Sequence, residues 1–184
     1  MCHNLQSLCI EFQKSVASGL MDFISTQNHL KYLNLCSYRG MASLTKLFNE
    51  EARKIFFTNL KELNLFRIHF EGLQHIIVPN LQNLKIHLHT KDEILIKFLE
   101  SSGKNLKELN LNGVDGLLGS SIAKLCPNLQ KISSILTDDD GLESLKMIFN
   151  NCQYLESIKI WYSDPLQRKG NFGDRCKIFT ETFS

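Results

Sequence analysis

A hydrophobic phrase of the form L-x-x-L-x-L recurs along the chain at nearly regular intervals. Its copies begin at the following residues: Leu5, Leu30, Leu60, Leu81, Leu106, Leu129 and Leu155. The intervals are 25, 30, 21, 25, 23 and 26 residues, with an average of 25. Isoleucine replaces leucine in some copies, and Ser134 stands where the sixth copy should have its last apolar residue. A phrase that repeats about every 20 to 29 residues predicts a stacked repeat architecture.

The alternation of apolar and polar residues inside each phrase is typical of a β-strand. In NLKELNL, which begins at Asn59 and again at Asn105, two leucines point to one side and the residue between them to the other. A single unit has too little apolar surface to bury this side alone, so the units must stack and share one core. The sequence therefore predicts seven short strands that form one parallel sheet.

The segments between the phrases show the spacing typical of helices, because apolar residues recur there at intervals of three and four residues. Two such groups are Leu44, Leu47, Phe48 and Ile55, and Ile94, Leu95, Phe98 and Leu99. Thr90 and Glu93 have the spacing of a capping box, and Thr137 precedes three acids at 138–140 that favour a helix amino terminus. We expect a strand and a helix in every unit.

This pattern resembles that of the leucine-rich-repeat family, and the resemblance implies an α/β fold. In that fold the units form a horseshoe-shaped solenoid, with a parallel sheet on the concave face and helices on the convex face. We expect the leucine-rich-repeat domain to cover residues 1–163 in about seven repeats. An irregular tail containing Pro165 and Gly170 would follow over 164–184. Because neither end has a recognisable polar cap, we interpret the chain as one piece of a longer array.

Three cysteines share one phase of the repeat, three residues before a leading leucine. They are Cys2, Cys126 and Cys152, and the stretch around the second one reads LCPNLQKI. The other units have the following residues at this phase: Gln27, Phe57, Val78 and Gly103. The phrase C-x-x-L-x-x-L-x-L is similar to the cysteine-containing class of leucine-rich repeat found in the substrate-binding half of F-box proteins. We expect these cysteines to be small buried core residues.

The resemblance implies a protein–protein interaction module that holds a target protein on the concave face. In F-box proteins of SCF-type ubiquitin ligases, such a module recognises the substrate while the F-box docks the ligase adaptor. The alternative is a leucine-rich-repeat scaffold or inhibitor-like regulator without a role in ubiquitination. Both hypotheses predict a protein partner, and the first adds the adaptor, bound through a region outside this sequence.

The third, fifth and seventh positions of the phrase are expected on the concave face, away from the core. We predict the following binding residues: Tyr32, Asn34, Glu62, Asn64, Phe66, Lys85, His87, Glu108, Asn110, Lys159 and Trp161. Phe66 and Trp161 have the character of interface anchors, although aromatic residues at these positions also pack on neighbouring loops. For the polar residues, the alternative role is to keep an exposed sheet face soluble.

Composition and charge disfavour several classes of partner. Of the 184 residues, 43% are hydrophobic and 22% are charged, which is typical of a globular protein. The 21 basic residues are scattered among 19 acidic ones, for a net charge of +2, so no basic stripe for nucleic acid is formed. We find neither a signal peptide nor a run of about 18 apolar residues. We therefore expect a cytoplasmic or nuclear protein without membrane contact.

The sequence contains no motif of a catalytic or metal site. The six cysteines form no C-x-x-C pair, and His87 and His89 lack the further ligands that zinc needs. The three glycines of 113–119 are followed by no phosphate-binding lysine, and the acids at 138–140 lack the spacing of a calcium loop. We therefore predict a protein that is not an enzyme and needs no cofactor and no metal. Cys36 and His87 are the most reactive side chains expected on the open face.

Overall fold

The structure is a computed structural model of the 184-residue chain. The residues that it describes are 4–13, 19–37, 42–43, 55–69, 71–87, 90–114, 116–136, 139–163 and 176–182.

The central feature of the fold is an eight-stranded sheet in the order β1-β2-β5-β8-β9-β10-β11-β12. Its strands are β1 (Ser7–Phe12), β2 (Tyr32–Ser37), β5 (Glu62–Phe66), β8 (Asn83–Ile86), β9 (Glu108–Leu111), β10 (Lys131–Leu136), β11 (Ser157–Ser163) and β12 (Cys176–Thr182). The first seven strands pair in parallel with their neighbours, and each contains the L-x-L part of one phrase. The predicted seven-stranded parallel sheet is therefore confirmed.

The eighth strand was not anticipated by the sequence pattern. β12 pairs antiparallel with β11, from Ser157 opposite Thr182 to Ser163 opposite Cys176. The sequence analysis expected an irregular tail over 164–184, because this segment has no copy of the phrase. An antiparallel return strand can pair through main-chain hydrogen bonds without a copy of the phrase.

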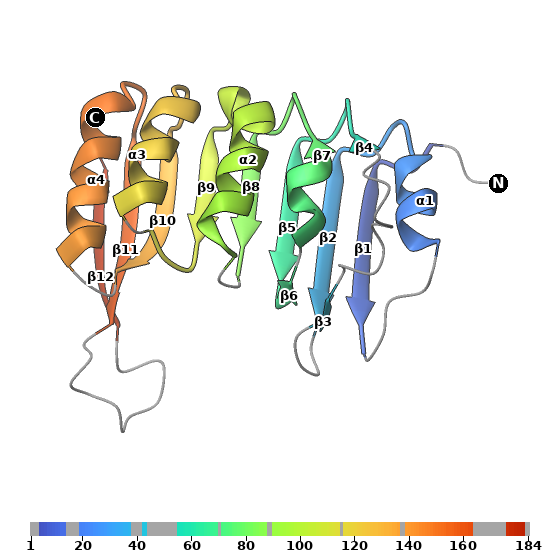
Figure 1. Ribbon diagram of the computed structural model, residues 1–184, viewed down its shortest axis with the longest axis horizontal. Coiled ribbons are helices and arrows are strands. Elements are labelled where there is room, and N and C mark those ends of the chain that lie inside the picture. Colours follow the sequence, from blue (N-terminus) through green and yellow to red (C-terminus); the bar gives the residue numbers. More distant parts are fainter. Residues whose placement is uncertain are drawn as a thin grey trace.

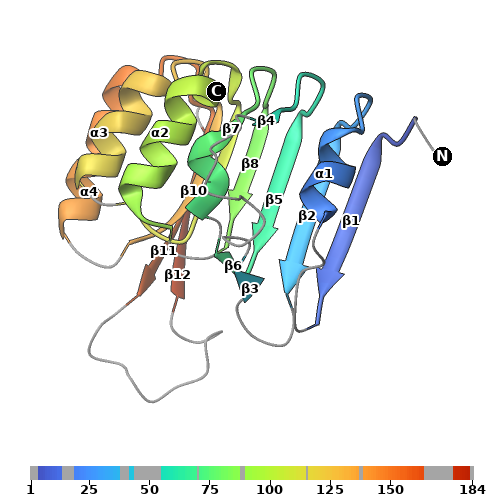
Figure 2. The same cartoon turned by 45° about the vertical axis from the view of Figure 1, so that its right-hand side comes forward.

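The helices lie in the segments that connect the parallel strands. They are α1 (Leu20–Ser25), α2 (Asp92–Ser102), α3 (Gly116–Leu125) and α4 (Asp139–Asn151), with a short 3-10 turn η3 (Gly103–Asn105) after α2. Figures 1 and 2 show these helices on one side of the sheet. The molecule is thus an α/β protein with a parallel sheet and interleaved helices, and its described helices leave the other sheet face open.

The connection from β5 to β8 departs from the expected strand and helix in every unit. It contains only the 3-10 helix η2 (Glu71–His75), flanked by the two-residue strands β6 (Ile68–His69) and β7 (Ile76–Ile77). β6 pairs with β3 (Ala42–Ser43), and β7 pairs with β4 (Ile55–Phe56). This unit is the shortest, with 21 residues between leading leucines, so it has the least chain available for a helix.

Three local predictions for the connections have different outcomes. α2 contains the second predicted apolar group, and all four residues of this group are buried: Ile94, Leu95, Phe98 and Leu99. The helix predicted up to Ile55 falls mostly on 44–54, outside the described residues, and Ile55 itself begins β4. α4 begins at Asp139, close to the acids that predicted a helix start, while Thr137 and Asp138 lie outside the described residues.

The capping box predicted at Thr90 and Glu93 is wrong. Lys91 is the residue at the amino-terminal cap of α2, and its side chain makes no capping hydrogen bond. The main-chain amides of Ile94 and Leu95 instead donate to the carbonyl of Lys91, at 3.0 and 3.2 Å. The helix therefore starts one residue later than the capping-box spacing requires.

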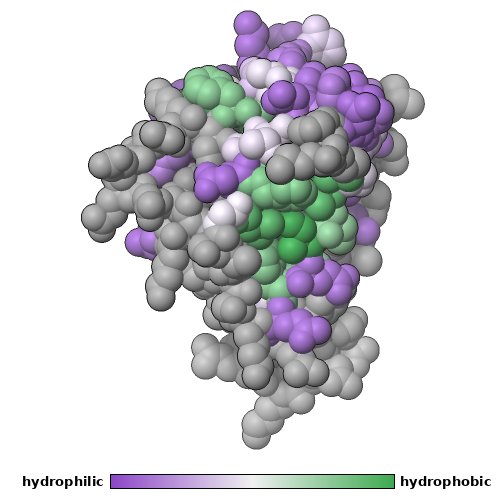
Figure 3. All heavy atoms as spheres, turned by 90° about the vertical axis from the view of Figure 1, so that its right-hand side faces the viewer, coloured by the Kyte–Doolittle hydropathy of each residue, from purple (hydrophilic) through white to green (hydrophobic). Residues whose placement is uncertain are grey.

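The leucines of successive phrases meet in one core between the sheet and the helices. The apolar phrase residues of the second to sixth copies are at most 3% exposed: Leu30, Leu33, Leu35, Leu60, Leu63, Leu65, Leu81, Leu84, Ile86, Leu106, Leu109, Leu111, Leu129 and Ile132. Ser134, which interrupts the pattern, is also buried. The apolar residues of the first copy, Leu5, Leu8 and Ile10, are only partly buried. Figure 3 shows apolar side chains on the surface at this end of the molecule.

The described helices are short relative to a lipid bilayer. None of them has the length and apolar character needed to cross a membrane.

Candidate functional site

The open face of the sheet consists of side chains that the pleat turns away from the core. Two rows run across all seven parallel strands in exact register with the phrase. The first row is Ser7, Tyr32, Glu62, Asn83, Glu108, Lys131 and Ser157, and the second is Cys9, Asn34, Asn64, Lys85, Asn110, Ser133 and Lys159. All fourteen side chains are partly or fully exposed. The positions predicted for these residues are confirmed, and we call the two rows together the open face.

A third row, at the carboxyl ends of the strands, is less regular. Phe66 and Trp161 belong to it and are partly buried, and His87 follows the end of β8 and donates its main-chain amide to the carbonyl of Leu65 at 2.9 Å. Cys36 pairs with Phe66 in register but is only 5% exposed. The expectation that Cys36 is a reactive group on the open face is therefore wrong, because neighbouring side chains cover this end of β2.

The two aromatic residues of the third row already have neighbours within the chain. The ring of Phe66 lies 5.2 Å from the ring of His87 with a tilt of 57°, and the guanidinium carbon of Arg67 lies 5.5 Å from the Phe66 centroid. The Nζ of Lys159 lies 4.9 Å from the centroid of the Trp161 ring. Both rings are therefore held in place by packing and by cation–π contacts, and each keeps part of its surface exposed.

Charge on the open face is divided between its two ends. Glu62 lies on β5, and Glu11 lies on β1 in the third row beside the open face, while Lys131 and Lys159 lie on β10 and β11. Between them Lys85 and Glu108 form an ion pair across β8 and β9, with 3.6 Å between Nζ and Oε1. The face is thus acidic at one end, neutral in the middle and basic at the other end.

His87 carries no positive charge at neutral pH. Burial of the imidazole lowers the pKa of His87 below its ordinary value of 6.5, and the nearby charge of Lys85 lowers this pKa further. Both effects disfavour the protonated form. The basic character of the carboxyl-terminal half of the face therefore comes from lysines and not from this histidine.

Two asparagines in the second row have buried oxygen atoms without a hydrogen-bond partner. Asn34 donates its Nδ2 to the sulfur of Cys9 at 3.4 Å, but its Oδ1 and the Oδ1 of Asn64 accept no hydrogen bond. A buried unsatisfied oxygen of this kind costs about 1–3 kcal/mol. Both residues lie on the first half of the face, on β2 and β5.

The two described cysteines of the shared phase are core residues, as predicted. Cys126 and Cys152 are buried, and the sulfur of Cys152 lies 3.6 Å from the carbonyl oxygen of Cys126. Burial, and to a smaller degree the charge of Cys152, raises the pKa of Cys126 to about 12. The other residues at this phase, Gln27, Phe57 and Val78, are buried as well. Cys2 lies outside the described residues.

Gly103 occupies the same repeat position as the cysteines, in the unit next to Cys126, and has no room for a side chain. A Cβ at this position would lie 2.8 Å from the carbonyl oxygen of Leu125 and 3.1 Å from the sulfur of Cys126. Glycine therefore allows two adjacent units to approach closely. The thiols at this phase contribute to packing and are poor nucleophiles at neutral pH.

The part of the chain that the structure describes contains no cluster of metal-binding groups. No three His, Cys, Asp or Glu side chains lie together there in a way that could hold a metal ion. His89, which was considered with His87 as a zinc pair, lies outside these residues.

An asparagine ladder links successive units, and the sequence analysis did not identify it. In the third to sixth units, the asparagine that precedes the leading leucine donates Nδ2 to a main-chain carbonyl of the unit before it. The pairs are Asn59 to Asn28, Asn80 to Thr58, Asn105 to Pro79 and Asn128 to Lys104, at 2.6, 2.7, 2.8 and 2.8 Å. The recurring Asn-Leu pair was the available signal. Tyr154 stands at this position in the seventh unit and ends the ladder.

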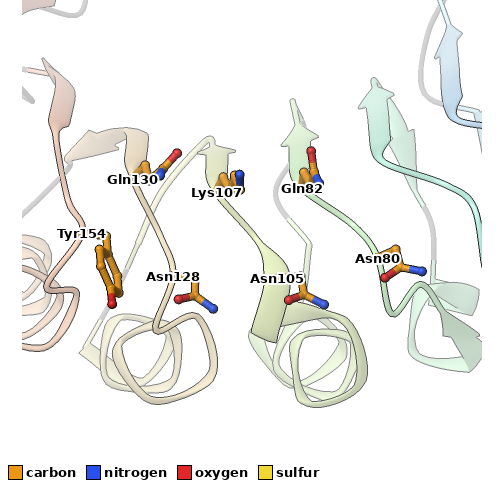
Figure 4. Close-up of a pocket in the computed structure, with 7 residues that line it drawn as sticks. All are labelled: Asn80, Gln82, Asn105, Lys107, Asn128, Gln130 and Tyr154. Carbon is orange, nitrogen blue, oxygen red and sulfur yellow. The ribbon is translucent and has the colours of Figure 1, made fainter.

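A groove lies along this edge of the sheet, where the chain enters the strands. Its volume is about 390 Å³, and it is lined by Asn80, Gln82, Asn105, Lys107, Asn128, Gln130 and Tyr154. Figure 4 shows two rows of side chains, with the three asparagines and Tyr154 in one row and Gln82, Lys107 and Gln130 in the other. We call this feature the rim groove. It is separate from the open face, because each of its residues precedes a strand.

Comparison of the chain with protein-family models, with curated proteins and with solved structures finds no match. The geometry and chemistry of the open face and the rim groove are therefore the basis for assigning a function.

Proposed function

We propose that this chain is a leucine-rich-repeat solenoid that binds another protein on its open face. The observation that carries the proposal is the unbroken register of two side-chain rows across seven parallel strands. The described helices lie on the opposite side of the sheet (Figure 2), where the leucines of the strands are buried, so the two rows form a continuous surface for contact with a partner.

The dimensions of the open face suit a protein partner. Seven strands at a spacing of about 4.8 Å give a surface on the order of 30 Å long. This length matches the edge of a small domain or an extended segment of chain. Tyr32 is 46% exposed, and Phe66 and Trp161 lie partly exposed on a neighbouring row. Aromatic residues held in place in this way are typical anchors of protein interfaces.

The distribution of charge indicates which partners the face favours. A partner with basic groups opposite Glu11 and Glu62, and acidic groups opposite Lys131 and Lys159, would be complementary in charge along the whole length. The central ion pair of Lys85 and Glu108 neutralises the middle of the face. Complementary charge mainly raises the association rate and fixes the orientation of the partner.

Substrate recognition for an SCF-type ubiquitin ligase is the specific role we propose for this binding. Its support is the cysteine phase, because buried Cys126 and Cys152 fit the cysteine-containing repeat class that the sequence resembles. A scaffold or inhibitor-like regulator would use the same face. Depletion of the protein separates these roles: a bound partner that accumulates supports the ligase role, and a partner whose activity changes at constant level supports the regulator.

Site-specific photo-cross-linking tests the binding proposal in cells. Benzoylphenylalanine is placed at Tyr32 on the open face or at Phe23 on α1, two aromatic positions that are 46% and 50% exposed. We expect the Tyr32 position to give one discrete protein adduct that the Phe23 position does not give. The same adduct from both positions, or an adduct from Phe23 alone, would contradict binding on the open face.

A further inference from the structure

The rim groove has polar side chains that are available for a ligand, while several main-chain carbonyls along it already accept hydrogen bonds within the chain. The carbonyl of Gln82 accepts the amides of Lys107 and Glu108 at 2.7 and 2.9 Å, and the carbonyl of Lys107 accepts the amides of Gln130 and Lys131 at 2.8 Å each. The carbonyls of the preceding turns accept the ladder asparagines. We therefore expect recognition in this groove to rest mainly on side chains.

The second row of the groove consists of side chains without partners of their own. The side chains of Gln82, Lys107 and Gln130 make no hydrogen bond or ion pair within the described part of the chain. Each ladder asparagine uses one N–H of its amide for the ladder, which leaves its other N–H and the lone pairs of Oδ1. The groove therefore offers carboxamides in fixed positions, each able to donate and to accept.

Charge and apolar surface occupy defined places in the groove. Lys107 is the one charged residue among the lining residues, and it lies between Gln82 and Gln130 on the neighbouring strands. Tyr154 closes one end of the groove and is 60% exposed. Glu156 occupies the next position of this row, beside Gln130, and is not part of the lining.

We infer that the rim groove binds a short extended peptide segment that carries one carboxylate and one aromatic residue. Carboxamides match the donors and acceptors of a peptide main chain, Lys107 matches the carboxylate, and Tyr154 packs against the aromatic side chain. Lys107 and Tyr154 lie two units apart, roughly 10 Å at a strand spacing of about 4.8 Å. Three residues of extended chain cover about the same distance, so the carboxylate and the aromatic residue are three positions apart in the peptide.

The rim groove is a different surface from the open face, so binding to the two surfaces can be tested separately. The probes are the blocked tetrapeptides acetyl-EGGF-amide and acetyl-FGGE-amide, which have the required separation in both chain directions. The matched neutral probes are acetyl-QGGF-amide and acetyl-FGGQ-amide. Binding is followed by NMR through the side-chain amide signals of Asn105, Gln82 and Gln130, which report on the groove directly.

We expect one of the glutamate peptides to shift these amide signals and to bind about fivefold more tightly than its glutamine counterpart, as expected for an exposed charge pair. Lys107→Gln should remove this difference, and Lys107→Arg should keep it. Lys124→Gln, a control at an exposed position on α3, should leave binding unchanged. Tyr154→Ala should weaken binding of the tetrapeptides but not of acetyl-EGG-amide or acetyl-GGE-amide.

Three results would overturn the inference. The first is equal binding of the glutamate and glutamine peptides. The second is a response of the open-face amides Asn64 and Asn110 in place of the groove amides. The third is a response of the groove to maltotriose with none to any peptide, which would make the site an oligosaccharide site. A negative result in the groove leaves the cross-linking test at Tyr32 unaffected.

Discussion

The two faces of the same sheet differ completely, although they are built from neighbouring residues of the same strands. In β5, Leu63 and Leu65 are 2% and 1% exposed, while Glu62 and Asn64 beside them lie partly exposed on the open face. The side chains on one face have only the interior to contact, and those on the other have solvent or a partner. The alternation of a strand thus separates residues that stabilise the fold from residues that are available for recognition.

This difference predicts separate consequences for substitutions one residue apart. Burying a leucine side chain contributes about 1.5–3 kcal/mol, and removing it leaves a cavity as well. Surface substitutions without a specific contact usually change stability by less than about 0.5 kcal/mol. Adjacent residues of one strand should therefore differ severalfold in their effect on the free energy of unfolding.

The largest effect is expected at Leu109, which is fully buried in the middle of the core. Leu109→Ala should lower the free energy of unfolding by about 2–5 kcal/mol, because it removes buried apolar surface and leaves a cavity. Urea denaturation measures this loss. The matched control is Asn110→Ala on the open face, with an expected change below about 0.5 kcal/mol. Similar losses for both variants would show that the two faces do not differ as described.

The next effect concerns the close packing of helices on the covered face. A Cβ at Gly119 of α3 would lie 2.3 Å from the Cβ of Ser144 on α4, whereas a Cβ at Gly116 would meet nothing within 4 Å. Gly119→Ala should destabilise the protein by about 1–3 kcal/mol through overpacking. Gly116→Ala, in the same helix, should be neutral or stabilising. Thermal unfolding compares the two, and equal midpoints would argue against the close contact of α3 and α4.

A smaller effect is expected for the asparagine ladder at the edge between the faces. Asn105→Ala removes the hydrogen bond to the carbonyl of Pro79 and should cost about 0.5–1.5 kcal/mol. Asn83→Ala on the open face removes no such bond and serves as the control. Urea denaturation of both variants measures the difference. If Asn105→Ala costs no more than the control, the ladder does not contribute to stability.

The smallest expected effect is the pH dependence that His87 contributes. The pKa of His87 is lowered in the folded protein, so folding favours the neutral imidazole and the unfolded chain binds its proton more readily. The stability that the neutral imidazole contributes is fully present above pH 6.5, the ordinary pKa of histidine. It is lost as the pH falls from there toward the lowered pKa of the folded protein. His87→Gln should therefore lose less stability than the wild type on acidification.

Urea denaturation between about pH 7.5 and pH 5 measures the pH dependence, since His titrates in this range. The same substitution at His29, which is exposed, is the control. If wild type and His87→Gln respond identically to pH, the imidazole is not held neutral by its surroundings.

The sequence predicted the repeated part of the fold well, because one rule applies to every unit. Leucines at fixed spacing must face a common interior, and this condition alone determined the strands, their parallel order and the residues of both open-face rows. Cys126 and Cys152 could be assigned to the core for the same reason. In each case the prediction needed only the period of two along a strand and the period of the repeat.

Other features could not be predicted, because they depend on neighbours outside the phrase. Cys36 has the phase of an open-face residue, but packing around the end of β2 buries it. β12 carries no phrase, so nothing in the repeat period indicates its pairing with β11. Lys91 stands at the helix cap in place of Thr90, although the spacing of Thr90 and Glu93 fits a capping box. The rim groove required the spatial alignment of residues from four units.

The most direct test of binding on the open face is the yield of the cross-linked adduct from the Tyr32 position in two further variants. One carries Asn110→Arg on the open face, and the other carries Lys124→Glu on the exposed side of α3. Both variants should unfold at the wild-type temperature, and the proposal predicts that Asn110→Arg abolishes the adduct while Lys124→Glu leaves its yield unchanged. An undiminished adduct in the Asn110→Arg variant would contradict the proposal that the open face holds the partner.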